Sequence, residues 1–356
     1  MGDLSIENLL FLLDEGLLNF DEFLILESEI GHNKSPQLMP DGPRLNFSAL
    51  SDEQCFSLFR FSKCDVRRMI NTLRIPSKFV CKNNSIATGL EAFCITLRRF
   101  AYRNRLADLV PIFGRSESEL SLIFNSTLDF IYATHGNSLN SLNQRWIQRG
   151  LPEFTTTLGN LCPLPNCWGF IDGTLRPITR PSRFQEITYS GHKRIHGLKF
   201  QSVVTPNGLI ANLAGPFEGK RHDAAVFRES GLGDELVRYM NSPNGEPHCL
   251  YGDAAYAVNQ YVLGPVKGIR VSPEEAEFNR QMSAVRQCVE WGFNKVIQTF
   301  AFLDYKKNLK LYLQPVGKYY AVGAFLTNCH TCLYGSPTTD YFGIRPPSLE
   351  QYINNR

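Results

Sequence analysis

Three acidic residues of the sequence, Asp172, Asp253 and Glu290, have the chemistry and the setting needed to bind divalent cations. Asp172 comes directly after an apolar run over residues 167–171, and Asp253 follows a similar run over residues 249–252, so we expect each aspartate at the end of a buried strand. Glu290 lies within a long stretch of helical periodicity. Carboxylates that meet from separate elements can hold two divalent cations for phosphodiester chemistry, so the trio predicts such a metal site.

The helix expected around Glu290 also presents an arginine on the same face. Arg286 precedes Glu290 by four residues, which places the two side chains on neighbouring turns. We expect Arg286 to bind a scissile phosphate or to orient Glu290, and an ordinary ion pair between the two is the simpler alternative. Each aspartate also has a simpler interpretation, because an aspartate that follows a strand commonly caps a turn.

The elements that must position these residues predict a mixed α/β sheet. In order, the pattern gives a strand ending at Asp172, a hairpin, a helix, a strand ending at Asp253 and a long helix. Three antiparallel strands followed by a parallel strand after a crossover form the ribonuclease H-like plan, which we therefore expect. The expected bounds are 198–204 and 209–213 for the hairpin strands, 223–240 and 274–300 for the helices, and 161–350 for the domain.

An all-α domain is predicted over residues 46–160. A short helix over residues 105–113, a turn at Gly114 and a helix capped by Ser116 and Glu119 outline a helix-turn-helix-like unit. Acidic residues at the start of its second helix disfavour phosphate contacts, so a purely structural bundle is the alternative. Further helices are expected from Ser51, over residues 63–72 and over residues 86–103, and residues 137–163 are expected to form an irregular connection.

Two surfaces of this helical region follow from the periodicity. One is an apolar face on the second helix of the unit, and the other is a basic face that is either solvated or in contact with phosphates. The apolar face comprises Leu120, Ile123, Phe124, Thr127, Leu128 and Ile131, and the basic face comprises Arg98, Arg99 and Arg103.

Composition and charge set broad limits on function. With 356 residues, 43% of them hydrophobic, the chain can bury a sizeable core. The first 30 residues hold eight acidic side chains and no lysine or arginine, which predicts an acidic amphipathic segment and a linker over residues 1–45. The remaining residues hold 37 basic and 26 acidic side chains, a net charge of +11 that suits a polyanionic partner.

The ten cysteines follow no disulfide framework, and we expect reduced thiols inside a cell. Cys329 and Cys332 have a spacing found in zinc sites, with Cys162 and Cys167 as candidate partners; thiols packed in the core are the favoured alternative. We expect neither a signal peptide nor an apolar run long enough to span a membrane.

These motifs together resemble the DDE endonuclease domain of PIF/Harbinger transposases and of nucleases derived from them. The resemblance covers residues 167–341 and rests on motifs that are specific jointly, not singly. It implies that Asp172, Asp253 and Glu290 bind Mg²⁺ or Mn²⁺, with a His222-Asp223 element close to the site. The matching residues are Gly169 to Thr174, Gly219 with His222 and Asp223, Gly252 and Asp253 with Tyr256, Leu263 and Pro265, Ser272, Glu275, Phe278 and Asn279, and Arg286 with Val289 and Glu290.

The same resemblance implies DNA as a partner, a nuclear location and help from a separate Myb/SANT-like DNA-binding protein. The cytoplasm is a second location compatible with the sequence, since the basic run at residues 306–310 is too short for a convincing import signal. We expect no membrane partner and leave a homo-oligomer open.

Two positions depart from the family pattern without removing a ligand. Lys220 stands where a small polar residue is usual, and Trp291 stands where a polar residue commonly follows the glutamate. Trp291 could stack on a splayed base or pack in the core. His222 could act on the leaving group or on a phosphate, or serve only as a helix cap.

The sequence therefore favours a divalent-metal-dependent DNA endonuclease or strand-transfer enzyme. A catalytically silent adaptor for a Myb/SANT-like protein is one alternative, and a stand-alone DNA binder that uses residues 105–131 is another. The expected catalytic residues are Asp172, Asp253, Glu290, His222 and Asp223. The expected DNA-phosphate ligands are Arg176, Arg180, Lys193, Arg194, Lys220, Arg221 and Arg286.

Overall fold

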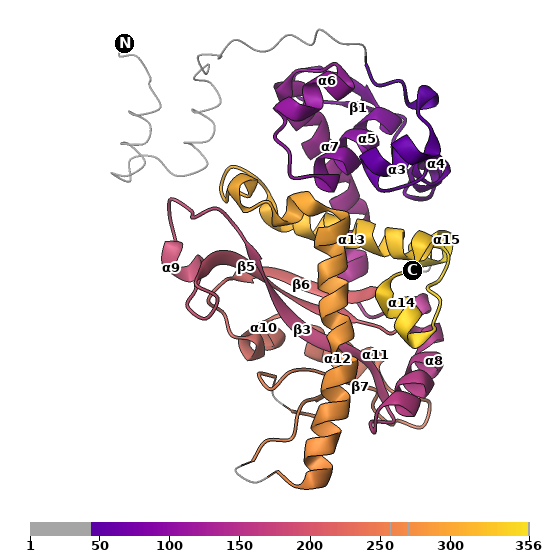
Figure 1. The fold of residues 1–356 in the computed structure, drawn as a ribbon, viewed down its shortest axis with the longest axis vertical. Coiled ribbons are helices and arrows are strands. Elements are labelled where there is room, and N and C mark those ends of the chain that lie inside the picture. Colours follow the sequence, from indigo (N-terminus) through magenta and orange to yellow (C-terminus); the bar gives the residue numbers. More distant parts are fainter. Residues whose placement is uncertain (1–43, 257, 269–270, 355–356) are drawn as a thin grey trace. The chain divides into compact units, whose positions relative to one another are not determined.

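The computed structural model describes residues 44–256, 258–268 and 271–354 (Figure 1). The acidic segment and almost all of the linker expected at residues 1–45 lie outside these described residues. The described part is built around a mixed sheet that the long helix α12 crosses, with a helical region ahead of the sheet in sequence. This is the mixed α/β class that the sequence predicts.

The sheet has the predicted strand directions. The strands β3, β5 and β6 are antiparallel, and β7 lies parallel to β3 on its other side, followed by β8. The hairpin of β5 and β6 turns at Gly208, whose φ of 78° is in the left-handed region that favours glycine. The bounds are Cys167–Pro177 for β3, Tyr189–Ser190 for β4, which pairs with β5, Ile195–Val204 for β5, Ile210–Glu218 for β6, Cys249–Tyr251 for β7 and Val262–Leu263 for β8.

The strand that carries Asp172 is longer than predicted. The sequence places its end at the aspartate, but β3 continues because β5 pairs with it from Asp172, opposite Ser202, to Pro177, opposite Gly197. By contrast, β7 pairs with β3 only as far as Phe170. Asp172 therefore lies within a strand, at the level where the neighbouring strand has just ended.

The helices after the hairpin differ from the prediction in one place. A single helix over residues 223–240 is predicted, but Gly231 has a φ of 71° and separates two short helices, α10 and α11. The long helix α12 forms as expected, with a capping box that pairs Ser272 with Glu275. The bounds are Gln185–Thr188 for α9, Asp223–Glu229 for α10, Leu232–Tyr239 for α11, Pro273–Thr299 for α12, Val316–Tyr334 for α13, Pro337–Phe342 for α14 and Leu349–Asn354 for α15.

The region ahead of the sheet is mainly helical, but it is not all-α. The helices α3 and α4 lie where the sequence predicts them, and Ser51 forms the capping box of the first. Residues 86–88, predicted to begin a helix, instead pair with residues 78–80 as a hairpin, because Thr88 caps a helix that starts only at residue 89. The bounds are Asp52–Phe59 for α3, Lys63–Thr72 for α4, Lys78–Val80 for β1, Ile86–Thr88 for β2, Gly89–Ala101 for α5, Val110–Phe113 for α6, Glu117–His135 for α7 and Arg145–Leu161 for α8.

The turn and the second helix of the predicted helix-turn-helix outline form as expected, but the first helix, predicted over residues 105–113, is a 3-10 turn over Ala107–Leu109 followed by the four-residue helix α6. Gly114 is left-handed with a φ of 58°, and Ser116 and Glu119 form the capping box of α7. The apolar face predicted for α7 is buried, and the helix packs against α5 and α13. This helix therefore has a structural role, and base reading by it stays a prediction.

The prediction of an irregular connection at residues 137–163 is wrong. Residues 145–161 form the helix α8, which packs against β3. Pro152 lies inside this helix, and tertiary packing of its apolar face outweighs the low helix propensity of proline and glycine. The buried side chains are Trp146, Ile147, Leu151, Phe154 and Leu158.

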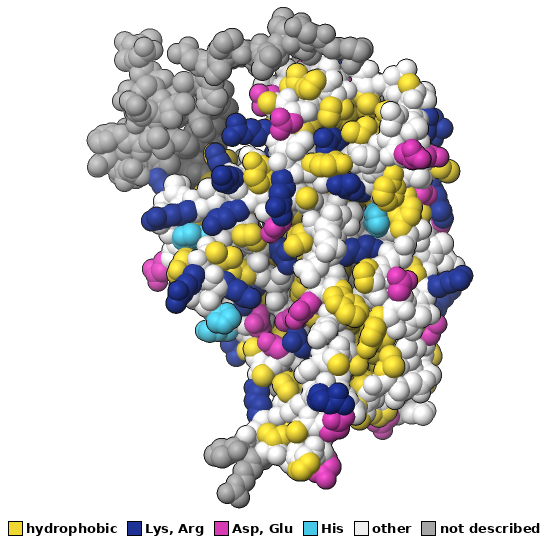
Figure 2. All heavy atoms as spheres, in the orientation of Figure 1, with side chains coloured by type: hydrophobic (Ala, Val, Ile, Leu, Met, Phe, Trp, Pro, Cys, Tyr) yellow, Lys and Arg dark blue, Asp and Glu magenta, His cyan; other side chains and the backbone are white. Residues whose placement is uncertain are grey.

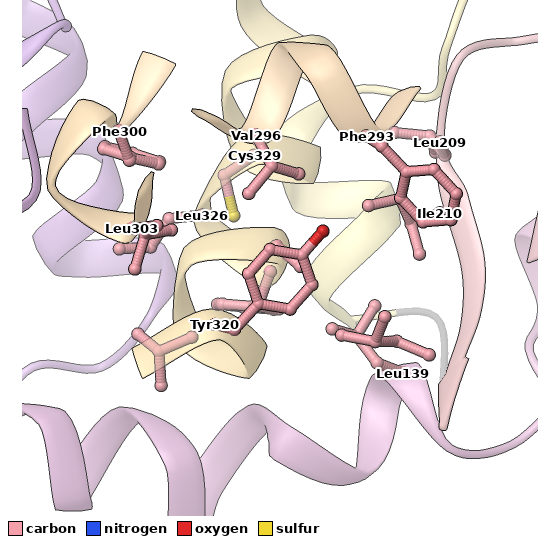
Figure 3. Close-up of a cluster of buried hydrophobic side chains, with 14 of the residues drawn as sticks. Leu139, Leu209, Ile210, Phe293, Val296, Phe300, Leu303, Tyr320, Leu326 and Cys329 are labelled. Atoms are coloured by element: carbon pink, nitrogen blue, oxygen red, sulfur yellow. The ribbon is translucent and has the colours of Figure 1, made fainter. Parts of the chain in front are cut away.

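One hydrophobic core joins the helical region to the sheet (Figure 3). Leu139 belongs to a 3-10 turn after α7, Gly136–Leu139, and lies in the same buried cluster as Ile210, Val296 and Tyr320. These residues come from both sides of the domain boundary expected near residue 160, so the two regions pack through a shared core. The limits proposed for the domains stay predictions.

Arg98 and Arg99 of α5, and Arg103 just after it, do not form the basic face considered from the sequence. Arg99 is buried, its guanidinium lies 3.9 Å from the ring centroid of Phe302, and burial lowers its pKa to about 10. Arg98 stacks on a neighbouring tyrosine ring at 4.0 Å. Of the three, only Arg103 is exposed, and it pairs with Asp304 at 2.8 Å. This set therefore stabilises the fold.

Replacing Arg115 with methionine is expected to lower the free energy of unfolding by about 3–5 kcal/mol, because two carboxylates would lose a buried partner. Arg115 is 1% exposed; its Nε and Nη2 donate to Glu91 at 2.6 and 2.9 Å, its Nη1 to Glu119 at 3.1 Å, and its Nη2 also to the Ile86 carbonyl at 2.7 Å. These bonds tie β2, α5 and α7 together. Urea unfolding followed by circular dichroism measures the effect.

A matched control is Arg68→Met. Arg68 makes a similar bidentate pair with Glu350 at 2.6 Å, but both side chains are exposed, so the loss is expected to stay below about 1 kcal/mol. Equal losses for the two variants would show that burial of Arg115 does not matter.

The cysteines are mostly core residues. Eight of the ten, including Cys162, Cys167 and Cys329, are buried, and all ten are free thiols. No zinc-type group of three or more His, Cys, Asp or Glu side chains occurs within residues 44–256, 258–268 and 271–354. None of the helices in the described ranges is long and apolar enough to cross a membrane.

Candidate active site

The parallel pairing of β7 with β3 brings Asp172 and Asp253 to one edge of the sheet. Phe170 pairs with Tyr251, and each aspartate comes two residues after its member of this pair. Asp253 comes just after the end of β7, and Asp172 lies within β3 at the level where β7 ends, so the two aspartates occupy the same edge of the sheet. The charge of Asp253 accordingly contributes to the raised pKa of Asp172.

Asp172 is half-buried, and its two oxygens have different partners. The Gly173 N–H donates to Oδ1 at 2.8 Å, and Arg286 Nη1 donates to Oδ2 at 3.0 Å. Burial nevertheless raises the pKa of Asp172 to about 6, and the charges of Asp253 and Asp223 act in the same direction. The carboxylate of Asp172 thus lies close to two further negative charges, those of Asp253 and Asp223, and a bound cation would offset their repulsion.

A third carboxylate, Asp223, joins from the first turn of α10. It lies directly over Gly173, where a Cβ would overlap the carboxylate, so the glycine after Asp172 permits this approach. Lys199 Nζ lies 3.0 Å from Asp223 Oδ1 and donates to the Arg221 carbonyl at 2.7 Å. The sequence analysis did not identify Lys199 as a site residue. The signal that could have identified it is that Lys199 is a single basic residue within an otherwise apolar strand.

Tyr256 adds a buried hydroxyl to the same cluster. Its oxygen has no hydrogen-bond partner among the residues that the structure describes. Burial and the charges of Asp223, Asp172 and Asp253 raise the pKa of Tyr256, which keeps the hydroxyl a neutral donor. An orphaned hydroxyl beside three carboxylates is typical of a site that receives water or another oxygen-bearing ligand.

Glu290 is not part of this cluster. It is exposed, one turn after Arg286 on α12, and its side chain makes no hydrogen bond or ion pair with another described residue. Arg286 pairs with Asp172 instead, so the simple ion pair between Arg286 and Glu290 does not form. Neither Asp172, Asp223 and Asp253 nor any other three His, Cys, Asp or Glu side chains among the described residues form a preassembled metal-binding group.

The donor set nevertheless fits a hard divalent cation. Asp172, Asp223 and Asp253 offer the carboxylate oxygens that Mg²⁺ and Mn²⁺ prefer. In this structure the Arg286 guanidinium supplies the positive charge at Asp172. A cation could take over that role if the guanidinium moves and Glu290, on the same helix face, turns inward.

The stretch of the chain that carries these residues matches a known protein family. A family model described as DDE superfamily endonuclease matches residues 171–328, a stretch that contains Asp172, Asp253 and Glu290. Residues 171–328 form a DDE superfamily endonuclease domain. The three acidic residues found from the sequence therefore lie within one shared domain.

The chain is also similar to two curated proteins. Protein ALP1-like from Arabidopsis thaliana is 24% identical over 235 residues, which cover 62% of this chain and 55% of that protein. The probable transposase for insertion sequence element IS702 from Microchaete diplosiphon is 26% identical over 135 residues, 38% of this chain and 47% of that protein. The chain thus spans about half the length of these curated relatives. No solved structure is significantly similar to it.

His222 of the endonuclease domain lies at the N-cap position of α10 without capping the helix. Its side chain is exposed and makes no capping hydrogen bond, so the structure gives no support to a role as a simple cap. Its neighbour Asp223 reaches the carboxylate cluster, which keeps His222 beside the site. Action on a leaving group or a phosphate stays a prediction.

The predicted phosphate ligands of the endonuclease domain fall into two groups. Those of the first group are exposed, and Figure 2 shows Lys and Arg side chains gathered over the part of the surface around α9 and the segment that leads into α13. Those of the second group are engaged within the protein. The exposed group comprises Arg180, Lys193, Arg194 and Lys220. In the second group, Arg221 forms ion pairs with Glu218 and Glu229, Arg176 hydrogen-bonds to Thr174, and Arg286 forms an ion pair with Asp172.

Trp291 and Lys220, the two residues that depart from the family pattern, each contact another side chain of the protein. Trp291 is half-buried, packs against the core and meets the Tyr341 ring edge-on at a centroid distance of 5.3 Å, which favours packing over base stacking. Lys220 Nζ lies 3.8 Å from Glu186, both at the surface. Within the described part of the chain, neither side chain forms a hydrogen bond or ion pair with Asp172, Asp223 or Asp253.

Metal binding by the endonuclease domain is expected to weaken in mild acid. Asp172 must be ionised to act as a ligand, and its pKa of about 6 means that protons compete below that pH. For one competing proton, affinity for Mn²⁺ should rise about tenfold between pH 5 and pH 7. Isothermal titration calorimetry over this range measures it, and a flat profile would contradict the assignment of Asp172 as a ligand.

Proposed function

We propose that the endonuclease domain is a Mg²⁺- or Mn²⁺-dependent DNA nuclease with a ribonuclease H-like sheet. The observation that carries the proposal is the convergence of Asp172, Asp223 and Asp253 at one half-buried sheet edge, with Arg286 as their counter-charge. The strand order, with β6, β5 and β3 antiparallel and β7 and β8 parallel to β3, supports the fold assignment.

Each residue of the site has a role that follows from its chemistry. Asp172 and Asp253 would hold the cations together with Glu290, which has to turn inward to reach them, and Asp223 would lie beside them as a further carboxylate. Mg²⁺ or Mn²⁺ bound there would supply Lewis-acid polarisation of a phosphodiester. Arg286, once released from Asp172, can bind phosphate oxygens in the two-pronged manner of a guanidinium. The Tyr256 hydroxyl can donate a hydrogen bond to an oxygen of the substrate or of the attacking group.

DNA is the proposed substrate because the part of the chain beyond the first 30 residues has a net charge of +11 and four predicted phosphate ligands are exposed. The attacking group is water in hydrolysis or a DNA 3′-hydroxyl in strand transfer. Since phosphate contacts release counterions, DNA affinity should fall steeply with salt.

Nicking of supercoiled plasmid tests the proposal. The wild type should nick in Mn²⁺ or Mg²⁺ and not in EDTA, and Asp253→Asn should be slower by on the order of 10³-fold, because it loses one charged group of the site. Glu246→Gln, at an exposed acid in the loop before β7, is the matched control and should retain the wild-type rate. Nicking that survives in EDTA or in Asp253→Asn would refute the metal site.

A catalytically silent adaptor is the second candidate, and one observation favours it. Arg286 already neutralises Asp172, and Glu290 contacts none of the other described carboxylates. In this case the chain would bind a Myb/SANT-like DNA-binding protein in the nucleus, as a monomer or a homo-oligomer, without cutting DNA. Metal binding without nicking, together with saturable binding to a purified Myb/SANT-like domain, would favour the adaptor.

A further inference from the structure

A surface pocket lies between α3 of the helical region and the helices α12, α13 and α14. It has a volume of about 550 Å³, a size typical of sites for small molecules. Two basic side chains, one histidine, one carboxylate and two aromatic rings line it and carry the inference. They are Arg60, Lys295, His330, Asp340, Phe56 and Tyr334.

The pocket is separate from the carboxylate cluster, although α12 contributes to both. Lys295 follows Arg286 by nine residues on this helix, which is about 14 Å along the helix axis. Nine residues also correspond to two and a half turns, so the two side chains leave the helix on opposite faces. Lys295 therefore belongs to a different surface from Arg286 and its partner Asp172.

Lys295 places a buried ammonium group in this pocket. It is 9% exposed, and its Nζ donates to Thr331 Oγ1 at 2.8 Å and to the Gly335 carbonyl. Burial lowers the pKa of Lys295 to about 8, so the group is still mainly charged at pH 7. It forms no ion pair with any residue of the described ranges, and a bound anion would offset the cost of burying its charge.

Arg60 adds a second positive charge from the end of α3. Its guanidinium stacks on the Tyr102 ring at 4.4 Å and donates one long hydrogen bond, of 3.4 Å, from Nη2 to the Ala101 carbonyl. Its Nε has no hydrogen-bond partner among the residues that the structure describes, and none of their carboxylates pairs with the guanidinium. Arg60 therefore has hydrogen-bonding capacity that these parts of the protein do not fill.

The pKa of His330 shows that the two positive charges act at the same place. Burial lowers this pKa to about 3, and the charges of Lys295 and Arg60 act in the same direction. His330 is therefore neutral at pH 7. Asp340 is the one carboxylate among the residues that line the pocket, and it is exposed. The pocket thus has two positive charges against one negative charge.

Aromatic rings form an apolar part of the pocket wall. Phe56 is 41% exposed and Tyr334 is 38% exposed, and their ring planes meet at 85° with centroids 5.5 Å apart. The Tyr334 hydroxyl donates to Asp65 at 2.5 Å and accepts from the Ser62 N–H at 2.9 Å. Because its hydroxyl is held in this way, Tyr334 offers its ring to a ligand, and planar groups pack well against such rings.

We propose that this pocket binds a phosphorylated small molecule of the nucleotide class. Arg60 and Lys295 would bind the phosphate, the first as a two-pronged donor and the second as a point charge, while Phe56 and Tyr334 contact the planar ring. A bare anion would leave the exposed rings unused, and an apolar ligand would leave the charges uncompensated. The inference uses no residue of the proposed nuclease site and does not rest on that function.

Isothermal titration calorimetry on the full chain in EDTA tests the pocket. The probes are ADP, adenosine and inorganic pyrophosphate, and EDTA prevents metal-mediated binding at the carboxylate cluster. The wild type should bind ADP more tightly than either of the other two, because only ADP has both the phosphates and the ring. Arg60→Gly should weaken ADP binding about tenfold or more. This variant should fold, because glycine readily adopts the φ of 68° at this position.

Two further variants separate the rings from the charges and provide a control. Phe56→Ala should weaken ADP binding about fivefold or more and leave pyrophosphate binding unchanged, because it removes a ring and no charge. Lys82→Met, at an exposed lysine in the turn between β1 and β2, is the matched control and should bind ADP as the wild type does.

The outcomes are distinct from those of the nuclease assay. The inference is overturned if the wild type does not bind ADP, if pyrophosphate binds as tightly as ADP, or if Arg60→Gly retains wild-type affinity for ADP. A protein that binds ADP through Arg60 but never nicks plasmid would leave the pocket assignment standing and refute only the proposed nuclease. Nicking without ADP binding would do the reverse.

Discussion

Asp172→Asn is expected to abolish metal-dependent nicking and yet leave the metal-free protein at least as stable as the wild type at pH 7. The rate should fall on the order of 10³-fold, because an amide cannot supply the charge that the site provides. The stability effect follows from the raised pKa of Asp172, about 6 in the folded protein against an ordinary value of 3.8.

The raised pKa of Asp172 sets the direction of the effect on stability. A raised pKa means that the folded state prefers the protonated carboxyl. The protonated Asp172 therefore stabilises the fold fully below pH 3.8, and this contribution to the free energy of unfolding is lost as the pH rises through 6. At pH 7 the ionised group costs up to roughly 3 kcal/mol. Asparagine has the same shape and no charge, so it avoids this cost, although its weaker bond to Arg286 offsets part of the gain.

Urea unfolding in EDTA at pH 4.5 and pH 7.5 measures the difference, which should be larger at the higher pH. Asp234→Asn on α11 is a matched control at an exposed aspartate and should change neither nicking nor stability by more than about 0.5 kcal/mol. A variant that nicks DNA normally, or that is clearly destabilised at pH 7.5, would contradict the assignment.

Arg286→Met is expected to lower the free energy of unfolding by about 3 kcal/mol at pH 7.5 in the absence of metal. The substitution leaves the half-buried Asp172 without the guanidinium that lies 3.0 Å from its oxygen. The loss should shrink at pH 5, because a protonated Asp172 needs no counter-charge.

Divalent metal should reverse this loss. If Arg286 stands in for a cation at Asp172, Mn²⁺ at a fixed concentration should raise the Tm of Arg286→Met by more than that of the wild type, because the cation no longer has to displace a guanidinium. Nicking should still be impaired, since Arg286 is also the proposed phosphate ligand. Thermal unfolding with and without Mn²⁺ measures both effects.

Arg280→Met is the matched control on the same helix. Arg280 pairs with Glu277 at 2.5 Å, but both side chains are exposed, so its removal should cost less than about 1 kcal/mol and leave the Mn²⁺ shift unchanged. Equal Mn²⁺ shifts for wild type and Arg286→Met would show that Arg286 does not compete with metal.

The sequence by itself determined the elements whose signals are local. Capping residues such as Ser116 and Ser272 fix where helices begin, and the alternation and turn residues around Gly208 define a hairpin. Where such signals were misleading, packing decided: α8 forms around Pro152 because its apolar face meets β3, and Thr88 delays the start of α5. The order of the elements was enough to predict the strand directions of the sheet.

The sequence also identified Asp172 and Asp253, because each follows a short apolar strand, and the strand order alone sets them side by side. Only the tertiary structure showed what surrounds them. Arg286 meets Asp172 across 114 positions of the chain, and Asp223 lies over Gly173 with Lys199 beside it. Such contacts depend on the register of strands and on how α10 and α12 pack on the sheet, and no periodicity or cap encodes them, since a residue carries no local mark of a distant partner.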